Sequence, residues 1–262
     1  MPGFDWNKNG KKDNFDRFMD IKAMSSVSDD IDSDNLDIDE EFEETEDKDT
    51  LIISYKDSAT AFNGEKKGII NGKGEINNKI SNYLFKILEK EGIPTHFLKE
   101  ISSRETMVKR VEIIPLEVID RNIAAGSFSK RLEVEEGKEL MNPTLEFSYK
   151  NDSLGDPLIN SSYAQTLGIV SLDEIRKIKE LALKINEVLK IKFDSINLKL
   201  VDFKIEFGRY HNKVILADEI SPDTCRLWDK KTNEKLDKDR FHRDLGMVSE
   251  AYQEVENRLL KE

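Results

Sequence analysis

The chain has 262 residues and a formal net charge of −12, with 41 basic against 53 acidic side chains, which is the size of one large or two modest globular domains. The negative charge is concentrated, because residues 29–49 hold 13 acids and one lysine and leave 40 residues of each sign elsewhere. A neutral body excludes a basic nucleic-acid-binding domain, since phosphate contacts need clustered lysine and arginine. We therefore expect no nucleic-acid partner.

The apolar pattern and the cysteine content exclude further classes. No run approaches the roughly 18 apolar residues of a membrane span, and residues 1–14 contain no apolar stretch of a signal peptide. Cys225 is the one cysteine of the sequence, so it forms neither an internal disulfide nor a zinc site of paired cysteines. We expect a cytoplasmic protein without a membrane partner.

The first three expected elements differ sharply in composition. Residues 1–50 form an acidic segment that we expect to be poorly ordered or atypical, because its apolar residues are too sparse to offset the entropy of ordering. An apolar run at 51–55 predicts a strand. Apolar residues at helical spacing then predict a helix over 75–91.

The middle of the chain predicts two strands and a long helix. Apolar stretches at 107–114 and 116–119 are separated by Pro115, which predicts strands that meet at an irregular crossing. Ser171 and Glu174 have the spacing of a capping box, followed by an apolar stripe at helical period. We expect a long helix to begin there.

A hairpin and a final helix complete the predicted order. Residues 198–207 and 214–220 have the pattern of two antiparallel strands, and a last helix is expected from about Asp239 to the end. Early strands followed by mixed helices and a second hairpin indicate an α+β fold rather than a regular βαβ alternation.

The first strand of this hairpin carries the most informative pattern. From Val201 on, every second residue is apolar and the residues between are charged, and side chains of a strand alternate between its two faces. The expected core face carries Val201, Phe203, Ile205 and Phe207, and the opposite face carries Asp202, Lys204 and Glu206.

The return strand is expected to add two more carboxylates to the charged face. A turn near Tyr210 and His211 would set Asp218 and Glu219 opposite Asp202 and its neighbour, within a residue of register. Carboxylates held on strands suit Mg²⁺, which prefers a few carboxylates plus phosphate oxygens. Alternating charges that pair across a solvated hairpin face explain the same pattern, so both interpretations stay open.

Two further segments have the composition of anion-binding sites. Residues 121–131 place small residues between cations, and Gly126-Ser127 can open a helix whose N–H groups favour an anion. Arg226 follows an acidic strand end and a proline turn, where its planar guanidinium could hold a phosphate or neutralise the acids. An ordinary loop before an amphipathic helix is the alternative for the first segment.

Together these segments resemble the SAICAR synthetase (phosphoribosylaminoimidazole-succinocarboxamide synthase) family of purine biosynthesis. The resemblance covers about residues 51–260 and is most specific at Asp202-x-Lys204-x-Glu206-Phe207-Gly208 and Ser221-Pro222-Asp223. The matching stretches are 73–79, 92–95, 121–131, 150–152 with 156–157, 201–208 and 218–228.

The resemblance implies an ATP-dependent ligase that joins the carboxylate of carboxyaminoimidazole ribonucleotide (CAIR) to the amine of L-aspartate, with ADP and phosphate as by-products. An unactivated carboxylate resists amine attack, so an acyl phosphate is the implied intermediate. The implied fold has two α+β lobes, distantly similar to protein kinases, with ATP between them. We expect a nucleotide-binding lobe over 51–114, a substrate- and metal-binding lobe over 115–262, and a homo-oligomer.

The resemblance also implies roles for individual residues. The implied catalytic residues are Asp202 and Lys204, and the implied Mg²⁺ ligands are Glu206 and Asp218. The implied substrate-binding residues are Arg121, Ser127, Arg226, Asp152 and Asp156. The implied nucleotide-binding residues are Lys109, Ile113, Glu117 and Lys150.

The N-terminus departs from the family pattern. Members usually begin with a Tyr-x-Gly-Lys-Ala-Lys hairpin that covers the ATP phosphates, whereas residues 36–42 here read Leu-Asp-Ile-Asp-Glu-Glu-Phe. Acids at that place repel ATP unless Mg²⁺ or another arrangement compensates. Three interpretations follow: an active enzyme with an altered phosphate cover, a catalytically weak nucleotide-binding relative with an autoinhibitory or partner-binding arm, or a shifted gene model. The intact charged clusters favour activity.

Overall fold

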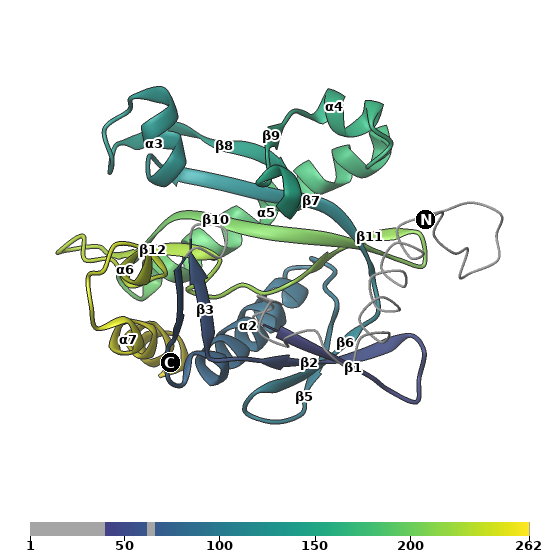
Figure 1. The fold of residues 1–262 in the computed structure, drawn as a ribbon, viewed down its shortest axis with the longest axis horizontal. Helices are drawn as coiled ribbons and strands as arrows, with labels where there is room; N and C mark the ends of the chain where they lie inside the picture. The colour runs from purple at the N-terminus through teal and green to yellow at the C-terminus, as the bar shows by residue number, and fades with distance from the viewer. Residues whose placement is uncertain (1–39, 62–65, 262) are drawn as a thin grey trace. The chain divides into compact units, whose positions relative to one another are not determined.

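The computed structural model describes residues 40–61 and 66–261, so most of the expected acidic segment of residues 1–50 lies outside the described part. Four antiparallel strands form the first sheet in the order β1-β2-β6-β5 (Figure 1). The strand predicted at 51–55 is confirmed as β2, which pairs with β1 on one side and β6 on the other. The bounds are β1 (Glu40–Glu44), β2 (Thr50–Tyr55), β5 (Phe97–Glu100) and β6 (Glu105–Lys109).

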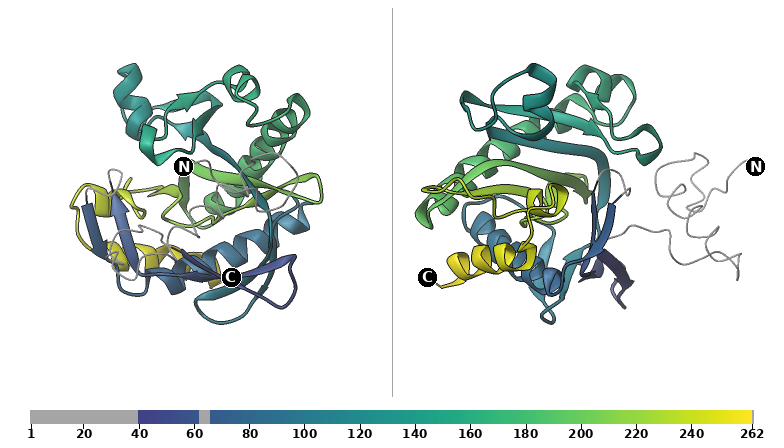
Figure 2. Two further views of the ribbon diagram at one scale, coloured as in Figure 1. Left: turned by 45° about the vertical axis from the view of Figure 1, so that its right-hand side comes forward. Right: turned by 60° about the vertical axis from the view of Figure 1, so that its left-hand side comes forward.

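A larger antiparallel sheet follows in the order β11-β10-β7-β8-β9, with β12 also paired to β10. Its long strands β7 and β10 run side by side, and α5 lies against β10 (Figures 1 and 2). The predicted hairpin is confirmed as β10 and β11. The bounds are β7 (Glu112–Ile123), β8 (Glu139–Tyr149), β9 (Leu158–Ile159), β10 (Leu198–Tyr210), β11 (Lys213–Ala217) and β12 (Cys225–Asp229), and a separate two-stranded sheet joins β3 (Ser58–Ala61) to β4 (Lys66–Ile69).

The helices confirm two predictions and correct a third. The helix expected over 75–91 is α2, and the capping box of Ser171 and Glu174 opens α5 as expected. The last helix is not continuous, because Gly246 and Met247 both have positive φ and separate α6 from α7. The bounds are α2 (Lys73–Lys90), α3 (Gly126–Leu132), the 3₁₀ helix η1 (Asp152–Leu154), α4 (Ser161–Thr166), α5 (Leu172–Ser195), α6 (Asp239–His242) and α7 (Val248–Leu260).

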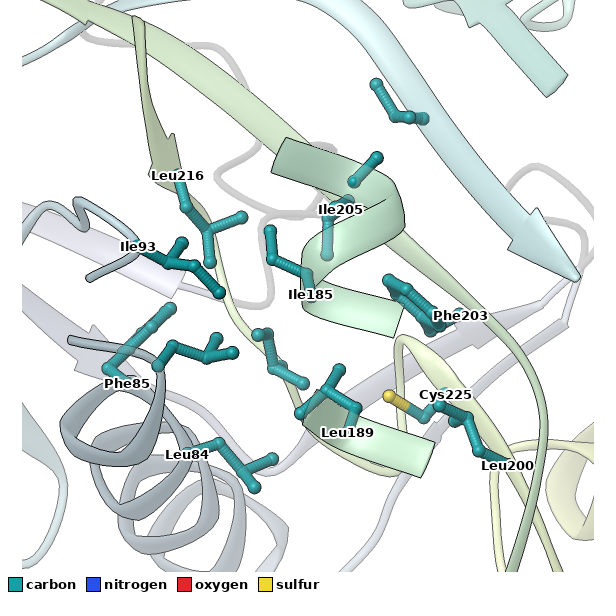
Figure 3. Close-up of a cluster of buried hydrophobic side chains, with 14 of the residues drawn as sticks. Leu84, Phe85, Ile93, Ile185, Leu189, Leu200, Phe203, Ile205, Leu216 and Cys225 are labelled. Atoms are coloured by element: carbon teal, nitrogen blue, oxygen red, sulfur yellow. The ribbon is translucent and has the colours of Figure 1, made fainter. Parts of the chain in front are cut away.

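One hydrophobic core joins the two long helices to the larger sheet. Leu84 and Phe85 of α2 belong to the same cluster as residues of α5 and Phe203 of β10 (Figure 3). These side chains are almost completely buried. The charged residues that alternate with Phe203 and the next apolar residues of β10 are therefore directed to the other face of the sheet. The fold is α+β, as predicted, and no helix in the described part is long and apolar enough to cross a membrane.

Pro115 does not separate two strands, which corrects the predicted crossing. β6 ends at Lys109, and Pro115 lies inside β7. The register between β7 and β10 shifts where Glu117 pairs with Glu206 and Ile113 pairs with Gly208. A proline lacks the N–H that a regular ladder uses, and a bulge tolerates it. The lobe boundary expected near Pro115 stays a prediction.

His96 should make the protein sensitive to acid. Burial and then the charge of Lys109 lower the pKa of His96 to about 3, and its ring nitrogens have no hydrogen-bond partner among the described residues. The pKa of His96 in the folded protein lies below the usual value of 6.5. The contribution of His96 to the free energy of unfolding is therefore constant above pH 6.5. It falls by about 1.4 kcal/mol per pH unit as the pH drops from 6.5 towards 3. Urea unfolding at pH 7 and pH 4.5 should show this loss, and His96→Leu should have the shallower dependence. Equal slopes in both proteins would contradict this role.

Candidate active site

A pocket of about 430 Å³ lies against the charged face of β7 and β10. Residues from α2, β8, β12, α3, α6 and α7 also line it, so segments far apart in the chain meet there. Seven of the residues proposed from the resemblance line this pocket: Glu117, Arg121, Ser127, Asp156, Asp202, Lys204 and Arg226.

Asp202 lies between two arginines at one end of the pocket. The strand register explains this arrangement, because Asp202 pairs with Arg121 of β7 on one side and with Arg226 of β12 on the other. Arg226 donates from Nη1 to both carboxylate oxygens at 3.0 and 3.1 Å, and Arg121 donates to Oδ2. Asp202 and Arg121 are 3% and 2% exposed. Arg226 also donates from Nε to Asp239 at 3.1 Å, so buried carboxylates hold both guanidinium groups in fixed positions at the pocket, and such planar forks suit an anionic ligand.

Lys204 occupies the next position along the same face of β10. Its Nζ lies 2.7 Å from Glu117 Oε1. Burial opposes the charge of Lys204, but Glu117 and two further carboxylates raise its pKa above the usual range. The ammonium group is therefore retained at neutral pH at a point where β7 and β10 both border the pocket.

The buried Glu206 and the half-buried Asp218 form an acidic pair beyond Lys204. Burial and the charge of Asp218 raise the pKa of Glu206 to about 7, although two nearby lysines act in the opposite direction. Lys150 donates to both oxygens of Glu206 at 2.7 and 2.8 Å. No group of three or more metal-binding side chains occurs in the part of the chain that the structure describes. Two carboxylates are nevertheless the donor set that Mg²⁺ uses beside phosphate oxygens, so the pair fits this ion.

The position of Asp218 corrects the predicted hairpin register. Glu206 pairs with Ala217 and Tyr210 with Lys213, so the turn contains His211 and its neighbour, both with positive φ. This tight two-residue turn lies further along the chain than the predicted turn. Asp218 therefore follows the residue opposite Glu206 and does not lie opposite Asp202.

Val201 is also placed differently from the prediction. It packs with Ile123, Ala125 and Trp228 in a small cluster, whereas Phe203 belongs to the main core. The pairing of β10 with β12 shifts between Leu200 and Asp202, and such a bulge interrupts the alternation of side chains. The expected core face is confirmed for Phe203, Ile205 and Phe207 only.

The structure does not bring the other proposed residues into the pocket lining. Lys109 donates to the carbonyl of Thr95 at 2.7 Å, and Ile113 is a partly exposed residue near the start of β7. Lys150 reaches the site through its bonds to Glu206. The backbone of Asp152 belongs to η1, and its side chain lies outside the described part.

Several pocket residues were missed by the sequence reasoning. Lys73 is the first residue of α2 and lies 2.8 Å from Asp223, and both line the pocket. The only signal for them was their place in the matching stretches 73–79 and 218–228. Lys238 had no signal at all, and its Nζ forms no hydrogen bond or ion pair with any residue in the described ranges. Burial and neighbouring cations lower the pKa of Lys238.

Gly126 provides a matched test of the Arg226 position. Its φ is +56°, and an added Cβ would lie 2.8 Å from Arg226 Nη2. Gly126→Ala should lower the free energy of unfolding by about 1–2 kcal/mol, because alanine is strained at this φ. It should also displace the guanidinium and so raise the KM for an anionic substrate about 10-fold. Gly246→Ala is the control, because it has φ +69° and open space around it. The same KM in both variants would show that the close approach at Gly126 has no role in binding.

Comparisons with known proteins identify the family of this chain. A sequence model of the family described as SAICAR synthetase matches residues 41–259. The phosphoribosylaminoimidazole-succinocarboxamide synthase of Lachnoclostridium phytofermentans is 65% identical over 215 residues, 82% of this chain and 92% of that protein. The crystal structure of the Ehrlichia chaffeensis synthase has a TM-score of 0.84 at 46% identity, covering 86% of this chain and 97% of that one. A SAICAR synthetase in complex with ADP has a TM-score of 0.83 at 49% identity, covering 85% and 95%. This chain therefore belongs to the SAICAR synthetase family.

Proposed function

We propose that this protein is the ATP-dependent ligase that joins CAIR and L-aspartate to give SAICAR, ADP and phosphate in purine biosynthesis. The family and the relative that is 65% identical support this activity, and the related structure with ADP supports a nucleotide site. In this chain the proposal is supported by one observation, which is that Asp202, Lys204 and Arg226 line the same pocket.

The cationic end of the pocket suits the phosphate of the ribonucleotide. Arg121 and Arg226 already point at one carboxylate, and Ser127 and Lys238 line the same space. Arginine forks and a lysine ammonium are the usual phosphate-binding groups of proteins. We assign these four side chains to the ribonucleotide, with Asp202 holding the two arginines in place.

The acidic pair suits the nucleotide end of the reaction. Glu206 and Asp218 would hold Mg²⁺, which when bound neutralises phosphate charge. Lys204 keeps its proton beside Glu117, so it can stabilise negative charge that develops on a transferred phosphoryl group. Lys150, bonded to Glu206, would orient this carboxylate. Lys109, Ile113, Asp152 and Asp156 keep their expected binding roles as predictions, as do the cytoplasmic location and the homo-oligomer.

A stoichiometric assay tests the proposed function. Purified protein with CAIR, L-aspartate, ATP and Mg²⁺ should form SAICAR and ADP in equal amounts, and omission of any component should stop both products. ATP binding without SAICAR formation would reject the ligase activity and would favour a nucleotide-binding relative.

A further inference from the structure

Asp239 is a buried carboxylate that the assignments above do not use. It is the first residue of α6, is 2% exposed and lies outside the pocket lining. Its Oδ1 accepts a hydrogen bond from Nε of Arg226 at 3.1 Å, whereas Nη1 of Arg226 donates to Asp202. Carboxylates on two different nitrogens of one planar group fix both its place and its rotation.

The remaining nitrogen of Arg226 is the one available to a ligand. Its Nη2 makes no hydrogen bond with any residue of the described ranges. A Cβ added at Gly126 would lie 2.8 Å from this atom, and Ser127, the next residue, lines the pocket. Because Nε and Nη1 are held by carboxylates, Nη2 keeps its hydrogens for an anion that binds beside Gly126.

The backbone around Asp239 is fixed relative to the strand that carries Arg226. The N–H of Leu227, the residue after Arg226 in β12, donates to Oδ2 of Asp237 at 2.7 Å. The N–H of Asp239 donates to Oδ1 of the same carboxylate at 2.8 Å. Asp237 is completely buried, so it joins the start of α6 to β12 and sets the distance from Asp239 to Arg226.

A row of alternating charges extends from Asp239 to the surface. Its Oδ2 lies 3.2 Å from Nη2 of Arg243 and 3.6 Å from Nζ of Lys235. Both cations also pair with Glu136, in the loop between α3 and β8. Burial opposes the charge of Asp239, but Arg226 and then these two cations lower its pKa. The carboxylate is therefore ionised at neutral pH.

We infer that Asp239 is a positioning residue that acts through Arg226, directing Nη2 toward the phosphate of the ribonucleotide, with Glu136 supporting it through the outer cations. This inference rests on the proposed ligase function, which names the anion. The phosphate of CAIR is remote from the carboxylate that reacts. Loss of the correct orientation should therefore weaken ribonucleotide binding and leave the bond-forming step nearly unchanged.

Steady-state kinetics with each substrate varied in turn tests the inference. Asp239→Asn should raise the KM for CAIR about 10-fold, with kcat and the KM for L-aspartate and ATP within about 2-fold of the native protein. Glu136→Gln should raise the KM for CAIR by about 2- to 3-fold, since it acts at the surface. Glu174→Gln is the control for both variants, because Glu174 pairs with Arg209 and lies outside the pocket lining. It should leave every KM unchanged.

A combined variant shows whether Asp239 acts through Arg226. Arg226→Met has no Nε, so adding Asp239→Asn to it should change the KM for CAIR by less than about 2-fold. The same 10-fold effect in both backgrounds would overturn the inference, as would a native KM for CAIR in folded Asp239→Asn. If Asp239→Asn does not fold, Glu136→Gln takes its place, and an unchanged KM for CAIR in that variant would also overturn the inference.

Ribose 5-phosphate separates this inference from the proposed function. It carries the phosphate without the imidazole, so its Kd should rise about 10-fold in Asp239→Asn, whereas ribose should bind both proteins equally. Equal affinity of both proteins for ribose 5-phosphate, with normal SAICAR formation by the native protein, would reject the positioning role alone. Absence of SAICAR from the native protein, with ribose 5-phosphate binding still weakened in Asp239→Asn, would reject the ligase function and retain the role of Asp239.

Discussion

Glu206→Gln is expected to lower kcat by about 10²- to 10³-fold while the protein stays folded. The substitution keeps the shape of a side chain that is 2% exposed and removes one of the two charges that suit Mg²⁺. It also weakens the bonds from Lys150. Loss of several kcal/mol of charge stabilisation in phosphoryl transfer corresponds to this change in rate. The measurement is SAICAR formation as a function of Mg²⁺ concentration, with thermal unfolding as the check on the fold.

Glu112→Gln is the matched control for this prediction. Glu112 lies on β7 of the same sheet and pairs with Arg209 at 2.8 Å, but its side chain is 53% exposed. Exposed ion pairs contribute about 0–1 kcal/mol, so kcat and the Mg²⁺ dependence should stay as in the native protein. Equal turnover in Glu206→Gln and the native protein would mean that the charged face of β10 is structural.

Arg226→Met is expected to affect both stability and binding. Arg226 donates to Asp202 and, from Nε, to Asp239 at 3.1 Å, and both carboxylates are almost completely buried. Removing the cation takes one partner from each of two buried acids, which costs about 3–5 kcal/mol. Urea unfolding should show this loss. The KM for CAIR should rise at least about 100-fold, if the variant folds, because a charged phosphate contact is lost.

Arg226→Lys separates the two effects. It keeps the positive charge between Asp202 and Asp239 and removes the planar fork, so we expect most of the stability to return while the KM for CAIR stays raised. Arg258→Met is the surface control, since Arg258 pairs with Asp229 and Glu254 and is partly exposed. Native KM in Arg226→Lys would show that charge alone, without geometry, determines binding.

The sequence predicted the local elements well where one periodicity dominated. The alternation along residues 203–207 and the capping box at Ser171 each depend on interactions within a few residues of one another, so their pattern is visible in the chain itself. The break before α7 was missed, although Gly246 stands between the two helices. The resemblance supplied the residues of the pocket that belong to recognisable motifs.

What the sequence determined by itself is the family, the α+β class and the charged face of β10. The tertiary structure decided which charges meet. A two-residue turn moved Asp218 next to Glu206, a bulge took Val201 out of the main core, and a bulge accommodated Pro115 inside β7. It also brought Lys73, Asp223 and Lys238 into one pocket. These outcomes depend on register shifts and on contacts between residues more than a hundred positions apart, and neither leaves a local pattern in the chain.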